Sequence, residues 1–419
     1  MTPAPAPPPP TEGPRRVLLH VGTPKTGTSY LQDVLFRNRE LLAEQGLCYP
    51  ADRFDGQFLA ALDLMRLPWG GLETQAIGAW DRLAEQVRAC QGTAVVSHEI
   101  LATASRSQVG RALESLGADD GPDKTEIHVI LSVRDLVRQI PAEWQENVKH
   151  RSTLSYARFL ERIQDPERAS RIGTWFWGVQ EIPDILNRWG HELPPERIHL
   201  VTVPPPGAPP GLLWARFSHA FGLAGFDLDL TEERANPSLG VPETALVRRI
   251  NRAANRVLDP ADYRPLVREL LAHQTLSHRT SSPRLRLPPD VHPWAVDLER
   301  SWVEEIEERG YDVVGDVADL LGVPPDDAYA DPDSPSERAV AGAAVDAIRA
   351  LLLENSRLRG VEARLAGELH ETRATLERAY LRPSYLLRER VVRKLESTGV
   401  GRGAMSVYRR ARGRSSRSA

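Results

Sequence analysis

A glycine-containing turn at residues 20–32, HVGTPKTGTSYLQ, constrains this chain more than any other feature. It follows the short apolar run Arg16-Val-Leu-Leu-His-Val, which predicts a buried strand, and it precedes a helical pattern that extends to about Glu44. A helix begins with unpaired backbone N–H groups and the positive end of its dipole, and glycines let the backbone approach a ligand closely. With Gly22 and Gly27 in this turn, the sequence predicts an anion-binding loop between a strand and a helix.

Three further apolar runs have the length of a strand, and each follows a helix-like stretch. They occupy residues 94–97, 127–133 and 197–203, where Pro204 ends the last one. Strands that alternate with helices form a parallel sheet covered on both faces, and ligands bind beyond the carboxyl ends of its strands. The sequence therefore predicts an α/β fold with three layers and a central parallel sheet.

The turn differs from the loop of nucleoside triphosphatases, G-x-x-x-x-G-K-[S/T]. Gly22, Gly27 and Ser29 match that pattern, but Thr28 stands at the lysine position and the lysine comes three residues earlier, as Lys25. A triphosphatase needs its lysine on the β- and γ-phosphates and commonly an acidic metal ligand on a second strand. The displaced lysine indicates that the loop binds a group donor other than a nucleoside triphosphate.

The string PKTGTS resembles the 5′-phosphosulfate loop of the sulfotransferase family that uses 3′-phosphoadenosine-5′-phosphosulfate (PAPS), with the pattern P-K-[S/T]-G-[T/S]-[T/S]. The matching residues are Pro24, Lys25, Thr26, Gly27, Thr28 and Ser29. This resemblance, which covers roughly residues 15 to 325, implies a three-layer P-loop fold, PAPS as co-substrate and no catalytic metal. It implies that residues 26–29 hold the 5′-phosphate. Lys25 would lie near the bridging oxygen and stabilise charge on the leaving phosphate.

A second contact with the donor is expected at Arg134, directly after the apolar run at residues 127–133. A guanidinium is a natural bidentate partner of phosphate, and the family resemblance implies that this arginine binds the 3′-phosphate. The family commonly adds a serine eight residues later, but Ala142 occupies that position. Three nearby side chains are candidates to replace it, namely Ser132, Arg138 and Gln139. Without the resemblance, Arg134-Asp135 also fits a structural ion pair or a degenerate metal-binding strand end.

Two candidates for a general base end the predicted strand at residues 94–97. Transfer to a hydroxyl needs a group that takes up the proton, and both His98 and Glu99 lie at the expected carboxyl edge of the sheet. Glu99 is slightly preferred, and the alternative is an acid at a helix N-terminus beside a surface imidazole. His20 is interpreted as a packed strand residue.

Other polar residues have two interpretations each. Asn236 and Ser238 precede a helical stretch, so they either cap that helix or close over the nucleotide. Gln145 and Lys149 share a face of the helix after Arg134, so they either line an acceptor cleft or face solvent.

The expected activity is sulfuryl transfer from PAPS to an acceptor hydroxyl on a small molecule, a saccharide or a glycolipid. Two alternatives remain open. One is a P-loop nucleotide-dependent kinase or NTPase, and the other is a non-catalytic coiled-coil scaffold with a degenerate nucleotide fold.

The segments outside the sulfotransferase-like part differ from it in composition. We expect a disordered proline-rich arm at 1–14, the sulfotransferase domain at 15–328, a linker at 329–343, a coiled-coil helix at 344–380 and a basic tail at 381–419. The a positions of the heptads are Ile348, Asn355, Glu362, Leu369 and Leu376, and the d positions are Leu351, Leu358, Leu365, Thr372 and Ala379. Asn355 at an a position suits a parallel homodimer, and the alternative is a single amphipathic helix folded back on the domain.

Charge separates the tail from the rest of the chain. Residues 382–419 hold eleven Arg and Lys against two acids, a balance of +9, so residues 1–381 sum to −13 within the net charge of −4. A folded part this acidic argues against nucleic-acid binding. The tail either lies on an anionic membrane surface or is a disordered solubilising segment.

Localisation follows from what the sequence lacks. No signal-peptide pattern precedes residue 15, no run of about 18 apolar residues occurs, and Cys48 and Cys90 are too few for a disulfide framework. We expect two reduced thiols in a cytoplasmic protein, with peripheral contact to the inner membrane face through the tail as an addition.

Overall fold

The computed structural model describes residues 15–118, 124–231, 238–323 and 328–380, together with residues 387, 390–392 and 397. The predicted arm at 1–14, Asn236 and most of the basic tail lie outside the described residues. Two compact units divide the chain, Met1–Ala347 and Ile348–Ala419, and each is described by itself. None of the described helices combines the length and the apolar composition needed to span a bilayer.

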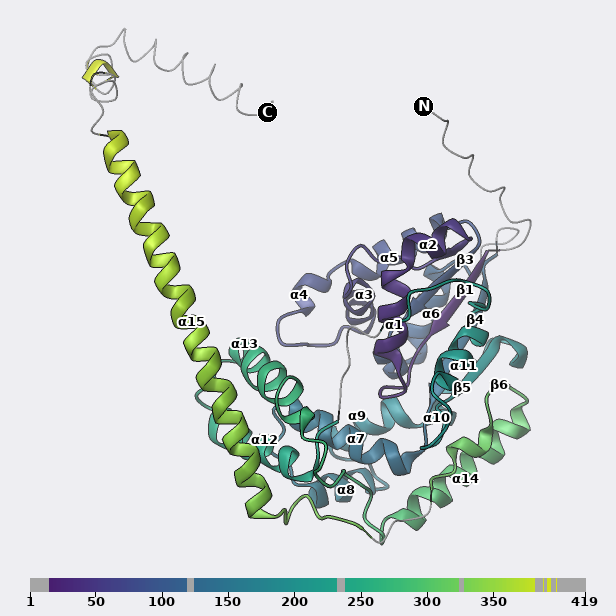
Figure 1. Cartoon of the computed structure of the whole chain (residues 1–419). Coiled ribbons are helices and arrows are strands. Elements are labelled where there is room, and N and C mark those ends of the chain that lie inside the picture. Colours follow the sequence, from purple (N-terminus) through teal and green to yellow (C-terminus); the bar gives the residue numbers. More distant parts are fainter. Residues whose placement is uncertain are drawn as a thin grey trace. The chain divides into compact units, whose positions relative to one another are not determined.

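The first unit contains a six-stranded sheet in which all neighbouring strands are parallel (Figure 1). The order is β2-β3-β1-β4-β5-β6. The strands are β1 (Arg16–His20), β2 (Leu47–Cys48), β3 (Thr93–Ser97), β4 (Glu126–Val133), β5 (Ile198–Thr202) and β6 (Asp312–Val314). The prediction of an α/β fold with a parallel sheet is confirmed. The two short edge strands β2 and β6 were not predicted.

Helices connect the strands and follow them. The α-helices of the first unit's α/β part are α1 (Thr28–Arg37), α2 (Arg39–Glu44), α3 (Gly56–Met65), α4 (Glu73–Ala76), α5 (Ala79–Ala89), α6 (Arg106–Ser115), α7 (Leu136–Lys149), α8 (Tyr156–Ile163), α9 (Arg171–Gln180), α10 (Ile182–Trp189), α11 (Leu212–Ala220), α12 (Val241–Ala254), α13 (Pro260–Tyr263) and α14 (His292–Arg309). The 3₁₀ segments are η1 (Glu99–Thr103), η3 (Pro195–Arg197), η5 (Leu276–His278) and η6 (Val317–Leu320), and η4 (Arg264–His273) is a π-helix. The long helix α15 (Glu337–Tyr380) crosses from the first unit into the second.

Apolar side chains cover both faces of the sheet, as expected for parallel strands. On one face, Leu18, Val95 and Ile130 belong to a buried cluster with α1 and α11, including Phe217 and Phe221. On the other face, the intervening strand residues are 0% or 1% exposed. They are Val17, Leu19, Ala94, Val96, Val129 and Leu131. The sheet is therefore the middle layer of a three-layer arrangement.

A buried carboxylate joins the start of α7 to α14. Glu299 of α14 is 1% exposed, and its Oε1 accepts hydrogen bonds from the backbone N–H groups of Leu136 and Val137. Its Oε2 accepts from the N–H of Gly322 at 2.9 Å. The first N–H groups of a helix have no partner within the helix, so Glu299 satisfies two donors that α7 itself leaves without an acceptor.

The predicted linker is attached to the domain by polar contacts. Asp333 accepts from the N–H groups of Tyr156 and Ala157 at 3.1 and 2.9 Å, at the start of α8, and it pairs with Arg248 at 2.6 Å. The helix α15 then begins at Glu337, earlier than the predicted start at residue 344. Its first turns bury Val340, Ala343 and Ala347 within the first unit, which explains the early start.

Removal of the Glu299 carboxylate should destabilise the fold. Glu299→Ala leaves one buried and two partly buried backbone donors without this acceptor, which we expect to lower the free energy of unfolding by about 2–4 kcal/mol. Glu304→Ala, on the exposed side of the same helix, should change it by less than about 0.5 kcal/mol. Urea unfolding followed by circular dichroism measures both, and equal effects of the two variants would contradict this role.

Candidate functional site

The loop between β1 and α1 is tied to the neighbouring strand β4 by its backbone. The N–H of Thr23 donates to the carbonyl of Ser132, and the N–H of Ser132 donates to the carbonyl of Gly22, both at 2.6 Å. The pairing of β1 with β4 thus continues into the loop, at the carboxyl edge of the sheet. This contact places the loop where ligands bind in parallel α/β sheets.

Both loop glycines are required by the geometry. Gly22 has φ 131°, and a Cβ there would lie 3.0 Å from the carbonyl oxygen of Glu99. Gly27 has φ 90° and is the N-cap of α1, and a Cβ there would lie 2.8 Å from a methyl carbon of Leu213. Lys25 also has a positive φ, at 64°. Positive φ favours glycine, so the loop backbone has little tolerance for other residues at positions 22 and 27.

A buried polar network lies under the loop. His20 bridges the Ser97 and Ser132 hydroxyls at 2.8 and 3.0 Å, and it is 0% exposed, as expected of a packed strand residue. Burial lowers the pKa of His20 to about 4, so the imidazole is neutral at pH 7. The hydroxyl of Thr26 lies 2.6 Å from both the Thr23 carbonyl oxygen and the Ser132 hydroxyl. Its side chain is engaged within the fold, which leaves the backbone N–H as its means of binding an anion.

Lys25 belongs to a cluster of basic side chains that share one carboxylate, Glu146 of α7. Lys25 Nζ lies 2.6 Å and Lys149 Nζ 3.7 Å from Glu146 Oε2. His150 and Arg268 lie 3.1 and 3.4 Å from Oε1. Burial alone would raise the pKa of Glu146, but the His150 hydrogen bond and the two lysines hold it well below its usual range. Burial lowers the pKa of Lys149 to about 8.

Arg134 lies directly after β4 and next to the loop. Its NH1 donates to the carbonyl of Lys25 at 3.3 Å, and its buried Nε has no hydrogen-bond partner in the described part of the chain. Burial and then the charge of Arg138 lower the pKa of Arg134 to about 10, so it stays charged at neutral pH. A partly buried guanidinium with an unsatisfied N–H is suited to an anionic ligand.

The candidates for the missing serine already have partners. Ser132 donates to the Gly22 carbonyl at 3.0 Å, and Gln139 Nε2 donates to the Pro24 carbonyl at 2.7 Å. Arg138 binds Asp135 and donates to the carbonyl of Pro204 at 2.8 Å. Asp135 therefore pairs with Arg138 and caps α7, rather than forming the ion pair with Arg134 that was an alternative. Ala142 itself has no hydroxyl to offer.

The two candidates for the base differ in their surroundings. His98 Nδ1 accepts the N–H of Ile100 at 3.2 Å, and its ring stacks on Phe58 with 4.9 Å between centroids. Glu99 Oε2 accepts from Gln32 Nε2 at 3.1 Å, and the Glu99 side chain is 23% exposed. Burial raises the pKa of Glu99, but His98, a backbone N–H and Gln32 lower it by more, which favours the carboxylate. The imidazole nitrogen that could take a proton is engaged by the backbone, so the geometry favours Glu99.

The remaining predicted residues have structural partners. Gln145 exchanges hydrogen bonds with the backbone of Leu239, at 2.8 and 3.0 Å, and is buried rather than free to line a cleft. Ser238 does not cap α12, because the N-cap is Gly240 and no side chain caps it. Thr28 is buried in the first turn of α1, and Ser29 is exposed beside it.

Sequence reasoning did not assign Glu146, Arg268 or Gln32 to the site. Gln32 follows the loop by one turn of α1, and Glu146 precedes Lys149 by three residues, so helical spacing was the available signal. Arg268 lies on η4, more than a hundred residues later, with no local pattern to indicate it.

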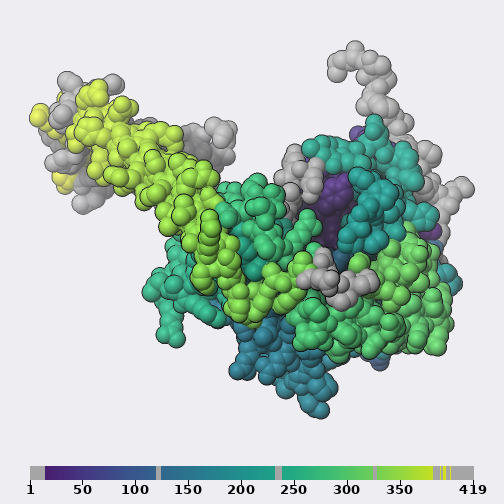
Figure 2. Space-filling view, turned by 60° about the horizontal axis from the view of Figure 1, so that its bottom comes forward, coloured from purple at the N-terminus to yellow at the C-terminus, as the bar shows by residue number. Residues whose placement is uncertain are grey.

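In Figure 2, atoms of the N-terminal part of the chain, in purple, lie at the base of a hollow.

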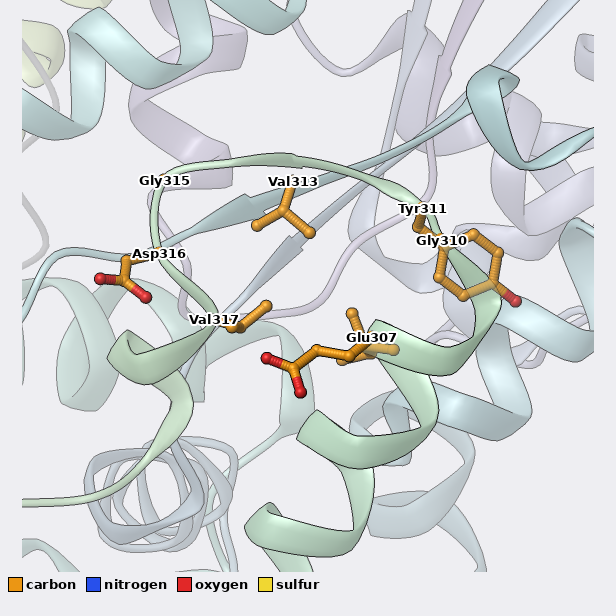
Figure 3. A pocket seen from close by; sticks show the side chains of 8 residues that line it. Glu307, Gly310, Tyr311, Val313, Gly315, Asp316 and Val317 are labelled. Atoms are coloured by element: carbon orange, nitrogen blue, oxygen red, sulfur yellow. The ribbon is translucent and has the colours of Figure 1, made fainter.

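A separate pocket lies at the edge strand β6, between the end of α14 and η6 (Figure 3). Its lining includes Glu307, Tyr311 and Asp316. Strands β4 and β5 stand between β6 and β1, so this pocket is not part of the loop site.

No family model, curated protein or solved structure matches this chain. Any assignment of function therefore depends on the residues of the site.

The pH dependence of stability should report on Glu143, which is 7% exposed on α7. Burial raises its pKa from 4.5 to about 7, although Lys25 nearby lowers it. The pKa of Glu143 is higher in the folded state than in the unfolded state. The contribution of protonated Glu143 to the free energy of unfolding is therefore full below pH 4.5 and is lost as pH rises through about 7.

Glu143→Gln removes this titration. Relative to the wild type, the variant should gain about 2 kcal/mol in free energy of unfolding between pH 5 and pH 8. Denaturant unfolding at the two pH values measures the gain. Glu114→Gln, at an exposed position of α6, serves as the control and should show no such change. A gain that is the same at both pH values would argue against a raised pKa.

Proposed function

We propose that this chain is a PAPS-dependent sulfotransferase with a three-layer P-loop fold, which transfers a sulfuryl group to an acceptor hydroxyl. The observation that carries the proposal is the position of Lys25. It lies on a strand-to-helix loop, at the N-terminus of α1, and beside Arg134, whose buried Nε has no hydrogen-bond partner among the described residues. The loop residues are those that resemble the 5′-phosphosulfate loop.

The charges of the site support an anionic donor. PAPS carries negative charge at its 5′-phosphosulfate and at its 3′-phosphate. Lys25 with the N-terminus of α1 suits the first, and Arg134 suits the second. The basic cluster around Glu146 also holds Lys149 and Arg268, so its cations outnumber the carboxylate that they share. Such an excess is suited to an incoming anion.

The transfer would proceed in line. The acceptor oxygen forms a bond to sulfur as the bond between sulfur and the bridging phosphate oxygen breaks, and the acceptor proton passes to Glu99. The electron pair of the broken bond stays on the leaving phosphate. Lys25 and the N–H groups of the loop would stabilise that charge. Orientation of the two substrates supplies a further part of the rate.

The acceptor is proposed only by class, as a small molecule, saccharide or glycolipid with a free hydroxyl. Contact of the basic tail with an anionic membrane would favour a glycolipid, and this too is a proposal. The alternatives of an NTPase and of a non-catalytic scaffold make different binding predictions.

Donor binding can be measured without knowing the acceptor. Calorimetric titration with 3′-phosphoadenosine-5′-phosphate should show binding without metal. Lys25→Ala and Arg134→Ala should each weaken it about 10- to 100-fold, because each removes a charge-assisted contact. Lys124→Ala and Arg300→Ala, at exposed positions, are the matched controls and should bind as the wild type does.

The titration separates the three functions. Binding of ATP with magnesium in place of the bisphosphate would favour the NTPase. Binding of neither nucleotide by the folded protein would favour the scaffold.

Catalysis should depend on Glu99 more than on His98. Transfer of labelled sulfuryl from PAPS to a panel of phenol, saccharide and glycolipid acceptors measures the rate. Glu99→Gln should lower kcat by about 10²–10⁴ with unchanged bisphosphate affinity, since it removes the proton acceptor. His98→Gln should lower it less than about tenfold. The reverse order would assign the base to His98.

A further inference from the structure

The second unit presents an apolar stripe on α15, interrupted by Asn355, Glu362 and Thr372. Large apolar side chains at the a and d positions are 40–56% exposed in the single chain. They are Ile348, Leu351, Leu358, Leu365, Leu369 and Leu376. An apolar stripe at heptad spacing over a helix of this length is typical of a surface that a second helix covers.

We infer that residues 348–380 form a parallel, in-register coiled coil with a second copy of this chain. The charged residues beside the stripe carry the inference. The g positions hold Glu354 and Glu368, and the e positions hold Arg359 and Arg373. In a parallel pair, a g residue faces the e residue of the next heptad on the partner, five positions later. Glu354 then faces Arg359 of the second copy, and Glu368 faces its Arg373.

The opposite orientation loses these pairs. An antiparallel pair matches g with g and e with e. The g positions of this segment are Glu354, Val361, Glu368 and Thr375, and the e positions are Leu352, Arg359, Ala366, Arg373 and Tyr380. Glutamates would therefore face glutamates or uncharged residues, and arginines would face arginines or uncharged residues. The pattern of charge selects the parallel arrangement.

Asn355 selects the register of the seam, and Glu362 weakens the pairing. Asn355 stands at an a position, where an asparagine pairs with its own copy across a parallel dimer and specifies alignment at some cost in stability. Glu362 also stands at an a position, so two carboxylates would meet in the seam and weaken the pair. The dimer is thus specific and weaker than an all-leucine seam would make it.

The contacts of the single helix do not compete strongly with this pairing. Glu354 accepts from Arg357 within the helix at 2.7 Å, and Glu368 lies 3.9 Å from Arg364. Exposed pairs three or four residues apart on a helix are worth a few tenths of a kcal/mol. Glu354 and Glu368 can therefore turn to the partner at little cost.

Mass measurement on the full-length chain tests association. Sedimentation equilibrium should give twice the monomer mass of 46.6 kDa. Glu354→Arg combined with Glu368→Arg places arginine at both ends of each pair, and should raise the dimer dissociation constant at least about tenfold. A chain with Arg359→Glu and Arg373→Glu should be weakened likewise, and an equimolar mixture of the two variants should recover the affinity. Glu362→Leu should tighten the dimer.

Orientation needs a separate test. Thr372→Cys, at a d position, should form a disulfide with its own copy under mild oxidation, because position 372 faces position 372 only in a parallel, in-register pair. Thr375→Cys, at a g position three residues away, is the matched control and should cross-link much less. Cys48 and Cys90 are present in both variants and cancel in the comparison.

Several outcomes would overturn the inference. A monomer at tens of micromolar would indicate a helix that folds back on its own domain. A dimer that does not cross-link at position 372, or whose mass is insensitive to the charge reversals, would mean a different interface. All substitutions lie beyond Ala347, the last buried residue of α15, so unchanged thermal unfolding of the α/β domain confirms that the variants are folded.

Discussion

The backbone contact between the loop and β4 is the constraint on which the site depends. Two hydrogen bonds join Gly22 and Thr23 to Ser132, and they extend the β1–β4 pairing past the end of the strand. Because Arg134 follows Ser132 by two residues, the same contact brings the guanidinium against the carbonyl of Lys25. The hydroxyl of Ser132 then joins His20 and Thr26 in one buried network. A neutral His20 suits that network, since a charged imidazole buried there would add a desolvation cost.

The positive charge at the carboxyl edge of the sheet comes from a few nearby side chains and not from the net charge of the chain. The chain up to residue 381 carries a net charge of −13, so its overall field does not attract anions. The basic side chains of the site come from the loop, from α7 and from η4, and they converge on the single carboxylate of Glu146. Burial weakens screening by solvent, so a few cations held together outweigh a larger number of exposed acids at a distance.

The sequence predicted those parts of the fold whose signals are local. Strands β1, β3, β4 and β5 are largely apolar runs, and the loop has its own spacing of glycines and lysine. The edge strands β2 and β6 contain two and three residues, too few to produce a periodic pattern. Their pairing depends on the neighbouring strand rather than on their own composition.

The site residues that could be predicted are also those with a local sequence signal. Lys25, Arg134 and Glu99 lie at strand ends, where parallel topology alone brings them to one edge. Arg268 and Asp333 lie elsewhere in the chain, and only the folded structure shows that the first reaches Glu146 and the second holds the start of α8. The predicted linker has no local pattern of a folded segment, because Asp333 forms its contacts with residues far away in sequence.

In the second unit, the sequence alone predicts the structural pattern, but the contacts that would stabilise it are not within the chain. Its heptads can be read from the sequence, but a helix with an exposed apolar stripe has few interactions of its own to stabilise it. Parallel pairing would supply them. It would also bring the ends of two chains together, and each carries a balance of +9 after residue 381. Within a Debye length of about 10 Å those charges repel. An anionic surface near the paired ends would offset that repulsion, so membrane contact and dimerisation would reinforce one another.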